Sequence, residues 1–457
     1  MIPIFQDGVS REKIMANINN QVIIIGAGIA GLTAAWYLKK CGIQALVLES
    51  DQQVGGRMKT IKIDDAIIDC GAQFLSSAYT IIPQLIKEAG LSDDFLTTSE
   101  WVGIIKNNHV ALIHPNKPWT LISSRLLSFG DLLRLGYTQF KLFYSKKKSL
   151  NDICDWTKYD NQSARDWLIQ QVGESTTQEL TSAIFNGFYY QSLNQSSAAM
   201  AAAVLAFSTW HPKTMTLKSG INSLAQKLAE KLTVKPNSAV SSIIETSSGI
   251  KIITDAGEFY AEHVIVTAPA PIAKNIIQNP DKEMSSLLET QYSSTITIAL
   301  LTHEGWSPPA AVNSAYGFLF NPDSNAKIAA LTIENNKCAS RKKSGHLINL
   351  MLADKEAKEF FQLADEEIFI EIQPELEKVF PGISAYVYKK EMTRWRYAMP
   401  YTPIGRAKAV SNYRATRNSS NRIWLAGDYL GLPWTDSAAE TGLWAAKEIE
   451  VRLQNPD

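Results

Sequence analysis

The sequence predicts an α/β fold in which a domain built on a parallel sheet is interleaved with an α+β domain that carries a helical insertion. At 457 residues the chain exceeds the size at which one hydrophobic core usually stops growing, which favours two domains. A β-branched run over 22–25 ends in glycines, a helical pattern fills 29–40, and strand character returns over 45–49. A strand, a glycine turn, a helix and a second strand make a βαβ unit, whose right-handed crossover sets the two strands parallel.

The pattern changes farther along the chain. Residues 120–206 show long helical patterns rich in Leu, Phe, Tyr and Ala, and strand character returns after them, from Val234 onward. Apolar, β-branched runs predict strands at 66–70, 243–254, 263–267, 293–301, 347–352 and 422–425. Helical spacing of the apolar residues predicts helices at 366–379 and 437–453.

This alternation predicts that neither domain is continuous in sequence. The segments assigned to the nucleotide-binding domain are 21–75, 211–275 and 401–457. The segments assigned to the second, substrate-binding domain are the mainly helical 76–210 and the sheet and helices of 276–400.

Composition and charge exclude several classes of function. With 45 Lys and Arg against 45 Asp and Glu, the chain has no net charge that would attract nucleic acid. A charged substrate must therefore be bound by charged residues close to its site. The histidines and cysteines form no cluster with metal-ligand spacing, so no metal site is expected. The four cysteines include no C-x-x-C pair and fit free thiols in a reducing compartment. Without an apolar signal core or a run of about 18 apolar residues, we expect a cytoplasmic protein with no integral membrane segment.

The first glycine turn has the pattern of a dinucleotide-binding site. Gly26-x-Gly28-x-x-Gly31 lies between the first strand and the helix that contains Ala30. In a Rossmann-type domain the first glycine allows a tight turn, the second lets the backbone approach a pyrophosphate, and the third lets the helix pack closely. The helix N-terminus supplies N–H donors. Glu49, at the end of the second strand, is placed to accept hydrogen bonds from ribose hydroxyls.

Two more small-residue turns follow. Gly55-Gly56-Arg57-Met58 could bring its arginine to the same pyrophosphate. Gly71-Ala72-Gln73 follows the strand at 66–70 and could lie against a large planar ring, although an ordinary strand-to-loop turn is the alternative. A nicotinamide enzyme has no evident need for a second clamp, so these turns favour FAD.

The chain resembles the flavin-containing amine oxidase superfamily, which includes monoamine and polyamine oxidases, protoporphyrinogen oxidase and phytoene desaturase relatives. One match covers 22–58, with the glycine turn and Glu49. The other, at 423–428 and 438–442, is similar to the family's C-terminal flavin-binding segment. Because the matches lie near opposite ends, the resemblance spans the chain and implies an FAD-dependent oxidoreductase.

The resemblance also implies several cofactor contacts. Asp428, which follows Gly427, would contact FAD near its ribityl-phosphate part, and the helix containing Ala438 would point its N-terminus at the flavin. The helix dipole would then stabilise negative charge on the reduced ring. The backbone of Val240 matches the position that holds the adenine in relatives. No cysteine lies between Trp395 and Asp428, where covalently flavinylated relatives carry their attachment thiol, so FAD is expected to be bound non-covalently.

The expected catalytic residues are two aromatics that would cage the substrate. Trp434 matches one cage position and Tyr401 is the candidate for the other, although either could be a core or interface aromatic. The lysine that contacts flavin N5 through water in many relatives is missing from the strand at 293–298. This difference moves the interpretation from a simple amine oxidase toward the protoporphyrinogen oxidase and desaturase branches.

Two features of the helical insertion are open to more than one interpretation. An aromatic cluster is expected near the substrate, although a cluster on a helix is often core; its members are Phe185, Phe188, Tyr189 and Tyr190. The basic, partly amphipathic stretch 126–148 could touch a membrane or a partner, or be the solvated face of a helix.

These observations predict hydride transfer to flavin N5 from a carbon next to nitrogen or from a ring carbon that flanks a forming double bond. Oxygen is the expected acceptor for reoxidation. The expected substrates are small molecules: a cyclic or secondary amine, or a dihydropyrrole or porphyrinogen-like ring. A polyene desaturase, an NAD-dependent dehydrogenase and a non-catalytic nucleotide-binding protein remain alternatives, and the chain could be a monomer or a homodimer.

Overall fold

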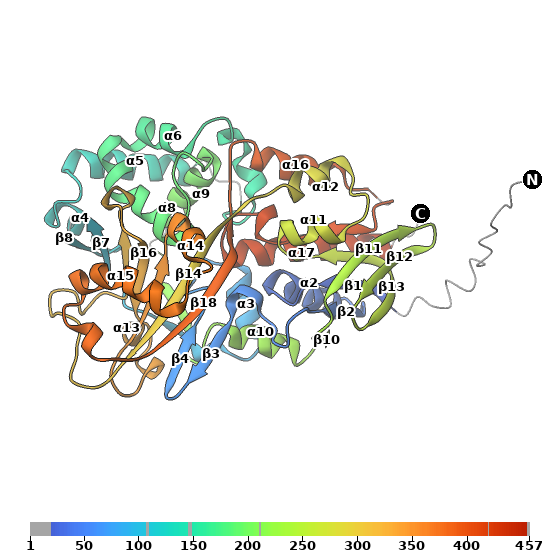
Figure 1. The fold of residues 1–457 in the computed structure, drawn as a ribbon. Helices are drawn as coiled ribbons and strands as arrows, with labels where there is room; N and C mark the ends of the chain where they lie inside the picture. Colours follow the sequence, from blue (N-terminus) through green and yellow to red (C-terminus); the bar gives the residue numbers. More distant parts are fainter. Residues whose placement is uncertain (1–19, 107–108, 145–148, 210–211, 419, 455–457) are drawn as a thin grey trace, which may run out of the picture.

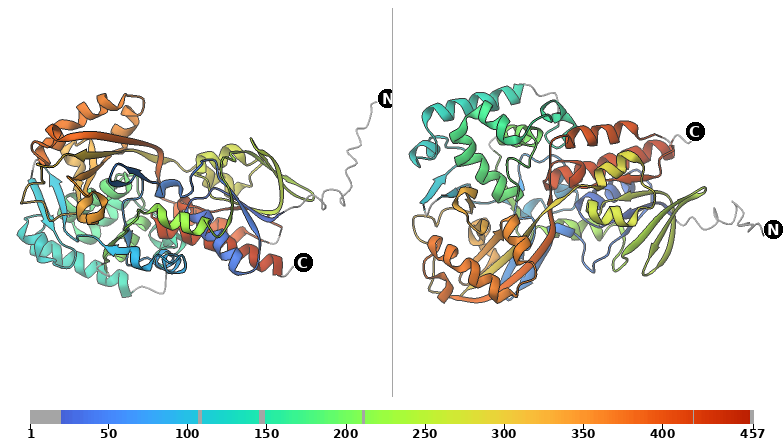
Figure 2. Two further views of the ribbon diagram at one scale, coloured as in Figure 1. Left: turned by 90° about the horizontal axis from the view of Figure 1, so that it is seen from below. Right: turned by 45° about the horizontal axis from the view of Figure 1, so that its top comes forward.

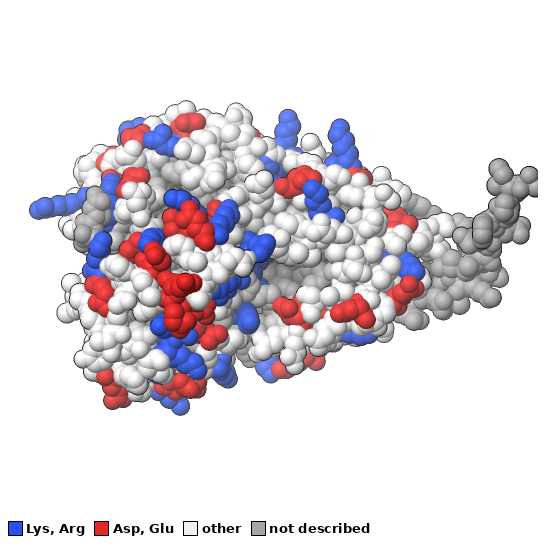
Figure 3. Space-filling model, viewed as in Figure 1, with Lys and Arg blue, Asp and Glu red and all other residues white. Residues whose placement is uncertain are grey.

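A computed structural model of the chain describes residues 20–106, 109–144, 149–209, 212–418 and 420–454. The molecule is elongated and has one large sheet in each half (Figure 1). Lys and Arg side chains are interspersed with Asp and Glu over the face in Figure 3, which is hollowed between the two halves. None of the helices in the described ranges is both long enough and apolar enough to cross a membrane.

The first sheet is mixed, and its parallel strands form the predicted Rossmann-type core. Its strand order is β10-β2-β1-β13-β12-β11, with β19 beside the end of β13. The strands β10, β2, β1, β13 and β19 run parallel, whereas β13, β12 and β11 form an antiparallel meander. The bounds are β1 Asn20–Ile25, β2 Ala45–Leu48, β10 Thr233–Lys235, β11 Val240–Thr246, β12 Gly249–Thr254, β13 Gly257–Val266 and β19 Ile423–Leu425.

Helices cover this sheet through very close contacts. The helix α2 Ile29–Lys40, confirmed with its predicted bounds, packs against α17 Thr435–Gln454. A Cβ atom added to Gly442 of α17 would lie 2.0 Å from the carbonyl oxygen of Ala30. Only glycine therefore permits this helix pair to approach so closely. The remaining helices in this half are α3 Ile81–Glu88, which packs against α17, and α10 Asn222–Ala229, α11 Ala270–Ile276, α12 Lys282–Leu288 and α16 Arg406–Thr416.

The second sheet is antiparallel apart from the parallel pair β15 and β7, and its order is β18-β14-β17-β16-β15-β7-β8. Its central strands are buried along their whole length, which explains their continuous apolar and small-residue runs. The bounds are β7 Val102–Lys106, β8 His109–Ile113, β14 Tyr292–Thr302, β15 Gly317–Phe320, β16 Ile328–Ile333, β17 Leu347–Leu352 and β18 Val387–Pro400.

The predicted helical insertion is present and forms a layer over the second sheet (Figure 2). Its longer helices are α5 Phe129–Tyr144, α6 Ala164–Val172, α8 Ser182–Tyr189 and α9 Ala198–Ser208, preceded by the short α4 Trp119–Ser123. Two further helices, α14 Asp354–Phe360 and α15 Asp365–Val379, belong to the same half of the molecule. The predicted domain boundary between residues 275 and 276 falls inside α11. The other predicted domain limits remain predictions.

A buried ionic cluster ties the two halves together. Asp69 ends β4 Ala66–Asp69, which pairs with β3 Thr60–Ile63. Its Oδ2 lies 2.6 Å from Lys337 Nζ and 2.9 Å from Arg341 Nη2. Glu334 Oε2 lies 3.1 Å from Lys337 Nζ, and all four side chains have no exposed surface. Burial alone would raise the pKa of Asp69, but the two cations hold it below its ordinary value.

We expect Lys337→Met to lower the free energy of unfolding by about 3–5 kcal/mol, because two buried carboxylates lose a shared cation. Chemical denaturation followed by circular dichroism measures the change. The matched control is Lys227→Met, which breaks an exposed pair with Glu230 at 2.9 Å and should cost less than about 1 kcal/mol. Equal small effects of the two substitutions would contradict this role for the cluster.

Candidate functional site

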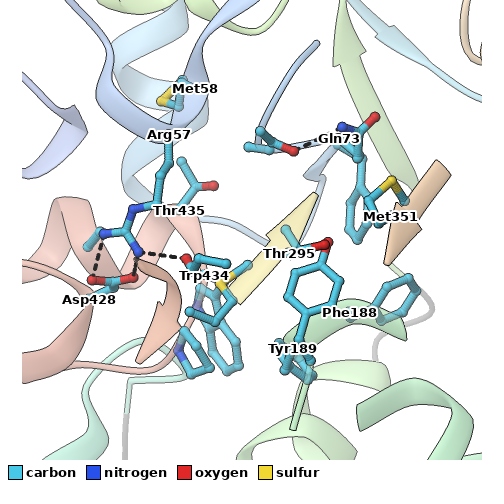
Figure 4. Close-up of a pocket in the computed structure, with 18 of the residues that line it drawn as sticks. Arg57, Met58, Gln73, Phe188, Tyr189, Thr295, Met351, Asp428, Trp434 and Thr435 are labelled. Carbon is cyan, nitrogen blue, oxygen red and sulfur yellow. Dashed lines mark hydrogen bonds and ion pairs between the residues drawn. The ribbon is translucent and has the colours of Figure 1, made fainter. Parts of the chain in front are cut away.

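One large cavity runs between the first sheet, the second sheet and the helical layer. Its volume is about 1120 Å³, which slightly exceeds the usual range of roughly 300–1,000 Å³ for a single ligand. Figure 4 shows Arg57, Asp428 and Trp434 on one side, and Phe188, Tyr189 and Met351 on the other. The cavity can therefore take a dinucleotide at one end and a second molecule beside it.

The first glycine turn has the geometry that a pyrophosphate requires. Gly26 has a φ of +101°, and a Cβ atom there would lie 2.8 Å from Thr267 Oγ1. Gly28 lines the cavity, and a Cβ atom at this position would meet no atom within 4 Å. Gly31 does not line the cavity; its added Cβ would lie 2.0 Å from the carbonyl oxygen of Gly26. Gly28 thus leaves room for a ligand, whereas Gly31 permits the helix to pack on the turn.

Glu49 lines the cavity next to the first glycine turn. Its Oε2 accepts a hydrogen bond of 2.6 Å from the N–H of Ala27, and its Oε1 accepts one of 2.9 Å from the N–H of Asp51. The N–H of Ser238 donates to the carbonyl of Glu49 at 2.7 Å, which brings the start of β11 alongside. Glu49 and Val240 therefore line the same end of the cavity, as a ribose and an adenine would require.

Arg57 and Asp428 meet in a two-pronged ion pair. Arg57 Nη1 donates to Asp428 Oδ2 at 2.6 Å and Nη2 donates to Oδ1 at 2.9 Å. Nη1 also donates to the carbonyl of Ala398 at 2.8 Å. Burial lowers the pKa of Arg57, but the carboxylate of Asp428 more than offsets this and the pKa lies above its ordinary value. Gly56, with a φ of +52°, turns the chain so that the arginine enters the cavity.

The third small-residue turn forms a fixed wall. A Cβ atom on Gly71 would lie 2.0 Å from the carbonyl oxygen of Arg57, and the N–H of Ala72 donates to that oxygen at 2.8 Å. Gln73 Nε2 donates to the carbonyl of Gly71 at 2.9 Å, and Gln73 Oε1 accepts from Asn349 Nδ2 at 3.1 Å. All three turn residues line the cavity. Their fixed backbone offers a surface for a planar ring.

The N-terminus of α17 faces the cavity, as the sequence predicts. Ala438 and Trp434 line it, and so do Gly427 and Asp428 just before them. Trp434 Nε1 donates to Asn151 Oδ1 at 2.9 Å, and its ring lies 5.5 Å from the ring of Phe207. The indole is therefore held in one orientation at the boundary between the cofactor end and the helical layer.

Tyr401 is not brought together with Trp434. It does not line the cavity; its hydroxyl instead hydrogen-bonds to Asp354 Oδ2 and accepts from Lys358 Nζ at 3.1 Å. Burial and the bond to Asp354 raise the pKa of this phenol. The structure therefore gives no support to Tyr401 as a cage aromatic. Tyr397, four residues earlier in β18, does line the cavity, and no sequence motif distinguished it.

The expected aromatic cluster does reach the cavity. All four side chains that the sequence singled out line it: Phe185, Phe188, Tyr189 and Tyr190. They come from α8 and the residue that follows it. Ile184 of the same helix and leucines from neighbouring helices complete this apolar wall, namely Leu121, Leu132, Leu135, Leu168 and Leu180.

The strand β14 contains the segment 293–298, which lacks the lysine that many relatives carry there. It carries threonines instead. Thr295 Oγ1 donates to the carbonyl of Leu352 at 2.8 Å. Thr297 Oγ1 is buried and has no hydrogen-bond partner among the described residues. In the register of the sheet Thr297 is flanked by Met351 and Thr393, and all of these residues line the cavity. This wall therefore carries hydroxyl groups and no charge.

We expect Gly28→Ala to abolish retention of the dinucleotide while leaving apoprotein stability within about 0.5 kcal/mol. The added methyl group meets no protein atom, but it occupies the space through which a pyrophosphate approaches the backbone. Gly31→Ala should instead lower the free energy of unfolding of the apoprotein by about 1–3 kcal/mol, because its methyl group meets backbone. Cofactor released on denaturation and apoprotein unfolding curves measure both effects. Full cofactor retention in Gly28→Ala would contradict the assignment.

Curated relatives match almost the whole chain. A coproporphyrinogen III oxidase from Bacillus subtilis (strain 168) is 23% identical over 470 residues, which cover 93% of this chain and 95% of the relative. An L-amino-acid oxidase from Sistrurus catenatus edwardsii is 25% identical over 475 residues, which cover 95% of this chain and 88% of the relative.

A solved structure and a family model agree with these relatives. The structure of a protein from Exiguobacterium sp. 255-15, provisionally assigned as a protoporphyrinogen oxidase, superposes with a TM-score of 0.75 at 18% identity and covers 95% of this chain and 99% of that one. This likeness shows a shared fold. The model of the family described as flavin containing amine oxidoreductase matches residues 29–450. The chain therefore belongs to the flavin-containing amine oxidoreductase family, whose enzymes typically use FAD.

Proposed function

We propose that this FAD-dependent oxidoreductase removes hydride from a C–H bond of a largely apolar cyclic substrate, at a carbon next to nitrogen or at a ring carbon, and that the reacting part of the substrate is uncharged. The substrate classes that fit are a cyclic or secondary amine in its neutral form, a dihydropyrrole, or a porphyrinogen-like ring, with oxygen as the acceptor. The name of the Bacillus subtilis relative supports a porphyrinogen-like ring, whose macrocycle is uncharged although a coproporphyrinogen carries carboxylate side chains.

The distribution of charge in the cavity carries this proposal. Among the described residues, the acidic side chains that line it are Glu49, Asp51 and Asp428, and all three lie at the cofactor end. Beside the helical layer the walls are mainly aliphatic and aromatic, with the polar or basic residues His114, Gln139, Ser208 and Lys213 among them and no acid from the described part of the chain. A substrate ammonium group placed there would be desolvated without a counter-ion, which is strongly unfavourable. A diamine or an amino-acid zwitterion therefore fits this cavity less well than a neutral ring.

The residues at the cofactor end fit FAD. Gly28 leaves open space beside the turn, and Glu49 lies where a ribose would be. Arg57 would supply hydrogen-bond donors to the phosphates, and Asp428 is paired with Arg57. When bound, FAD supplies the hydride acceptor. The N-terminus of α17 places a partial positive charge at this end of the cavity, which favours negative charge nearby.

The side chains on the substrate side would act by shape and exclusion of water. Trp434, Tyr189 and Tyr397 offer aromatic faces against which a flat ring can stack. The hydroxyl of Thr297 is free to bind a water or a substrate heteroatom. Such fixed positioning can supply several kcal/mol of a barrier when the reacting atoms are held in contact.

The cysteines support non-covalent binding and a reducing location. None of the four, all of which lie in the described part of the chain, lines the cavity, and all are free thiols. We therefore propose that FAD is held without a covalent bond. Free thiols also fit the cytoplasm, which remains part of this proposal.

Anaerobic bleaching of the bound flavin tests the substrate class. We expect neutral cyclic amines, dihydropyrroles or porphyrinogens to bleach it, whereas diamines and amino acids should leave it oxidised. Trp434→Ala should slow bleaching by about tenfold or more while FAD stays bound, because the substrate loses a stacking face. The matched control is Tyr401→Phe, which lies outside the cavity and should bleach at the wild-type rate. Bleaching by diamines or amino acids alone would refute the proposal.

A further inference from the structure

The helix α5 carries two apolar faces, and only one of them is used by the fold. Leu135, Thr138 and Leu142 are buried against the helical layer. The other face exposes a row of large side chains spaced by three or four residues: Phe129 65%, Leu133 58%, Tyr137 64%, Phe140 55% and Tyr144 69%. Trp119 of α4, 61% exposed, extends the set. These six residues are called the outer row below.

The outer row is a concentration of apolar surface. It holds half of the large apolar side chains that are exposed in the described part of the chain. The others lie on different elements, singly except for Tyr386 and Tyr388 around the start of β18. Contiguous exposed apolar side chains of this kind mark a surface that contacts something else. Figure 2 shows α5 at the outer edge of the helical layer, and none of the other described elements buries the outer row.

The charged residues within 117–144, which contain α4 and α5, are almost all positive. Residues 117–144 contain Lys117, Arg125, Arg134 and Lys141 against the single acid Asp131. Arg125, Arg134 and Lys141 are exposed, and Arg134 interacts electrostatically with Asp131 one turn earlier in α5. Lys141 Nζ lies 5.3 Å from the centre of the Tyr137 ring. The lysines at 146–148, which the sequence analysis included in its basic stretch, lie outside the described residues.

We propose that the face made by α4 and α5 docks on the surface of an anionic lipid bilayer. An interfacial helix combines a row of Trp, Phe, Tyr and Leu with flanking Lys and Arg, which is the pattern of this face. The aromatic and aliphatic side chains enter the headgroup region, and the cations pair with anionic headgroups.

A second copy of the chain fits this face less well than a bilayer does. In a two-fold dimer the same patch is present on both sides of the interface. The basic residues of one copy would then face those of the other, with one acid per copy to compensate. An anionic bilayer removes this repulsion while burying the same apolar atoms.

Docking would place the bilayer next to the apolar part of the cavity. Leu121 of α4 and Leu132, Leu135 and Gln139 of α5 line the cavity from the inner side of the same two helices. A helix with its side chains is roughly 10–12 Å across, so one layer of helix separates the two environments. This link to an apolar substrate rests on the proposed function, whereas docking itself does not.

Vesicle flotation of the full-length holoprotein tests the docking. We expect it to float with vesicles of phosphatidylcholine mixed with phosphatidylglycerol, and to float much less with phosphatidylcholine alone. The triple variant Phe129→Ser, Leu133→Ser, Phe140→Ser should lose bound fraction by about tenfold or more. Arg134→Glu with Lys141→Glu should weaken binding to the mixed vesicles only. Because these side chains are exposed, unfolding curves should match the wild type.

The matched control removes exposed apolar side chains from other faces. Ile370→Ser, Ile404→Ser, Val451→Ser changes residues that are 65%, 53% and 57% exposed, and should float as the wild type does. No flotation of the wild type, or equal flotation of the triple variant, overturns the proposal. Concentration-dependent dimerisation that the triple variant abolishes, without vesicle binding, assigns the face to a second copy instead. Flavin bleaching is read separately, so failure of docking and failure of the proposed function are distinguishable.

Discussion

The site depends on the ion pair between Arg57 and Asp428, because it joins parts of the chain that are far apart in sequence. Arg57 follows the second glycine turn, Asp428 follows the last strand of the first sheet, and the same guanidinium reaches the carbonyl of Ala398 in the second sheet. A guanidinium has five N–H donors, so these three bonds leave others for a phosphate. The pair thus fixes both sheets around one end of the cavity without using up its capacity to bind an anion.

Local chemistry explains why the cofactor end could be predicted from sequence. Gly26 needs a positive φ, Gly28 needs open space and Gly31 needs a close approach to the carbonyl of Gly26, and these needs arise mainly within one strand-turn-helix unit, although Thr267 also lies beside Gly26. Tyr401 shows where this reasoning ends. β18 contributes consecutive residues to the cavity wall, from Thr393 to Met399, but the strand ends at Pro400 and Tyr401 does not line the cavity. The position at which a strand ends is determined by tertiary packing, and the resemblance to the family did not predict it.

In the helical insertion, too, the sequence predicts the local structure but not the tertiary packing. The helical spacing of apolar residues predicted helices there, and the structure has them. In α5, however, apolar residues occupy two faces, and hydrophobic spacing alone does not say which face the core will take. Packing against α6 and α9 selects the face of Leu135 and Leu142, and the larger aromatic row is left outside. An overall balance of 45 basic and 45 acidic residues likewise conceals the local excess of positive charge beside that row.

The uncharged wall of β14 constrains how this enzyme can select a substrate. Thr297 lies between Met351 and Thr393 in the sheet, and the opposite wall is aromatic and aliphatic. The wall of β14 has no charged side chain of its own with which to orient a polar group. It must discriminate by shape and size, for which each methylene group contributes only about 1–3 kcal/mol. Selectivity among related rings then depends on how rigidly the walls are held, and the hydrogen bond from Trp434 to Asn151 and the buried cluster around Asp69 supply that rigidity.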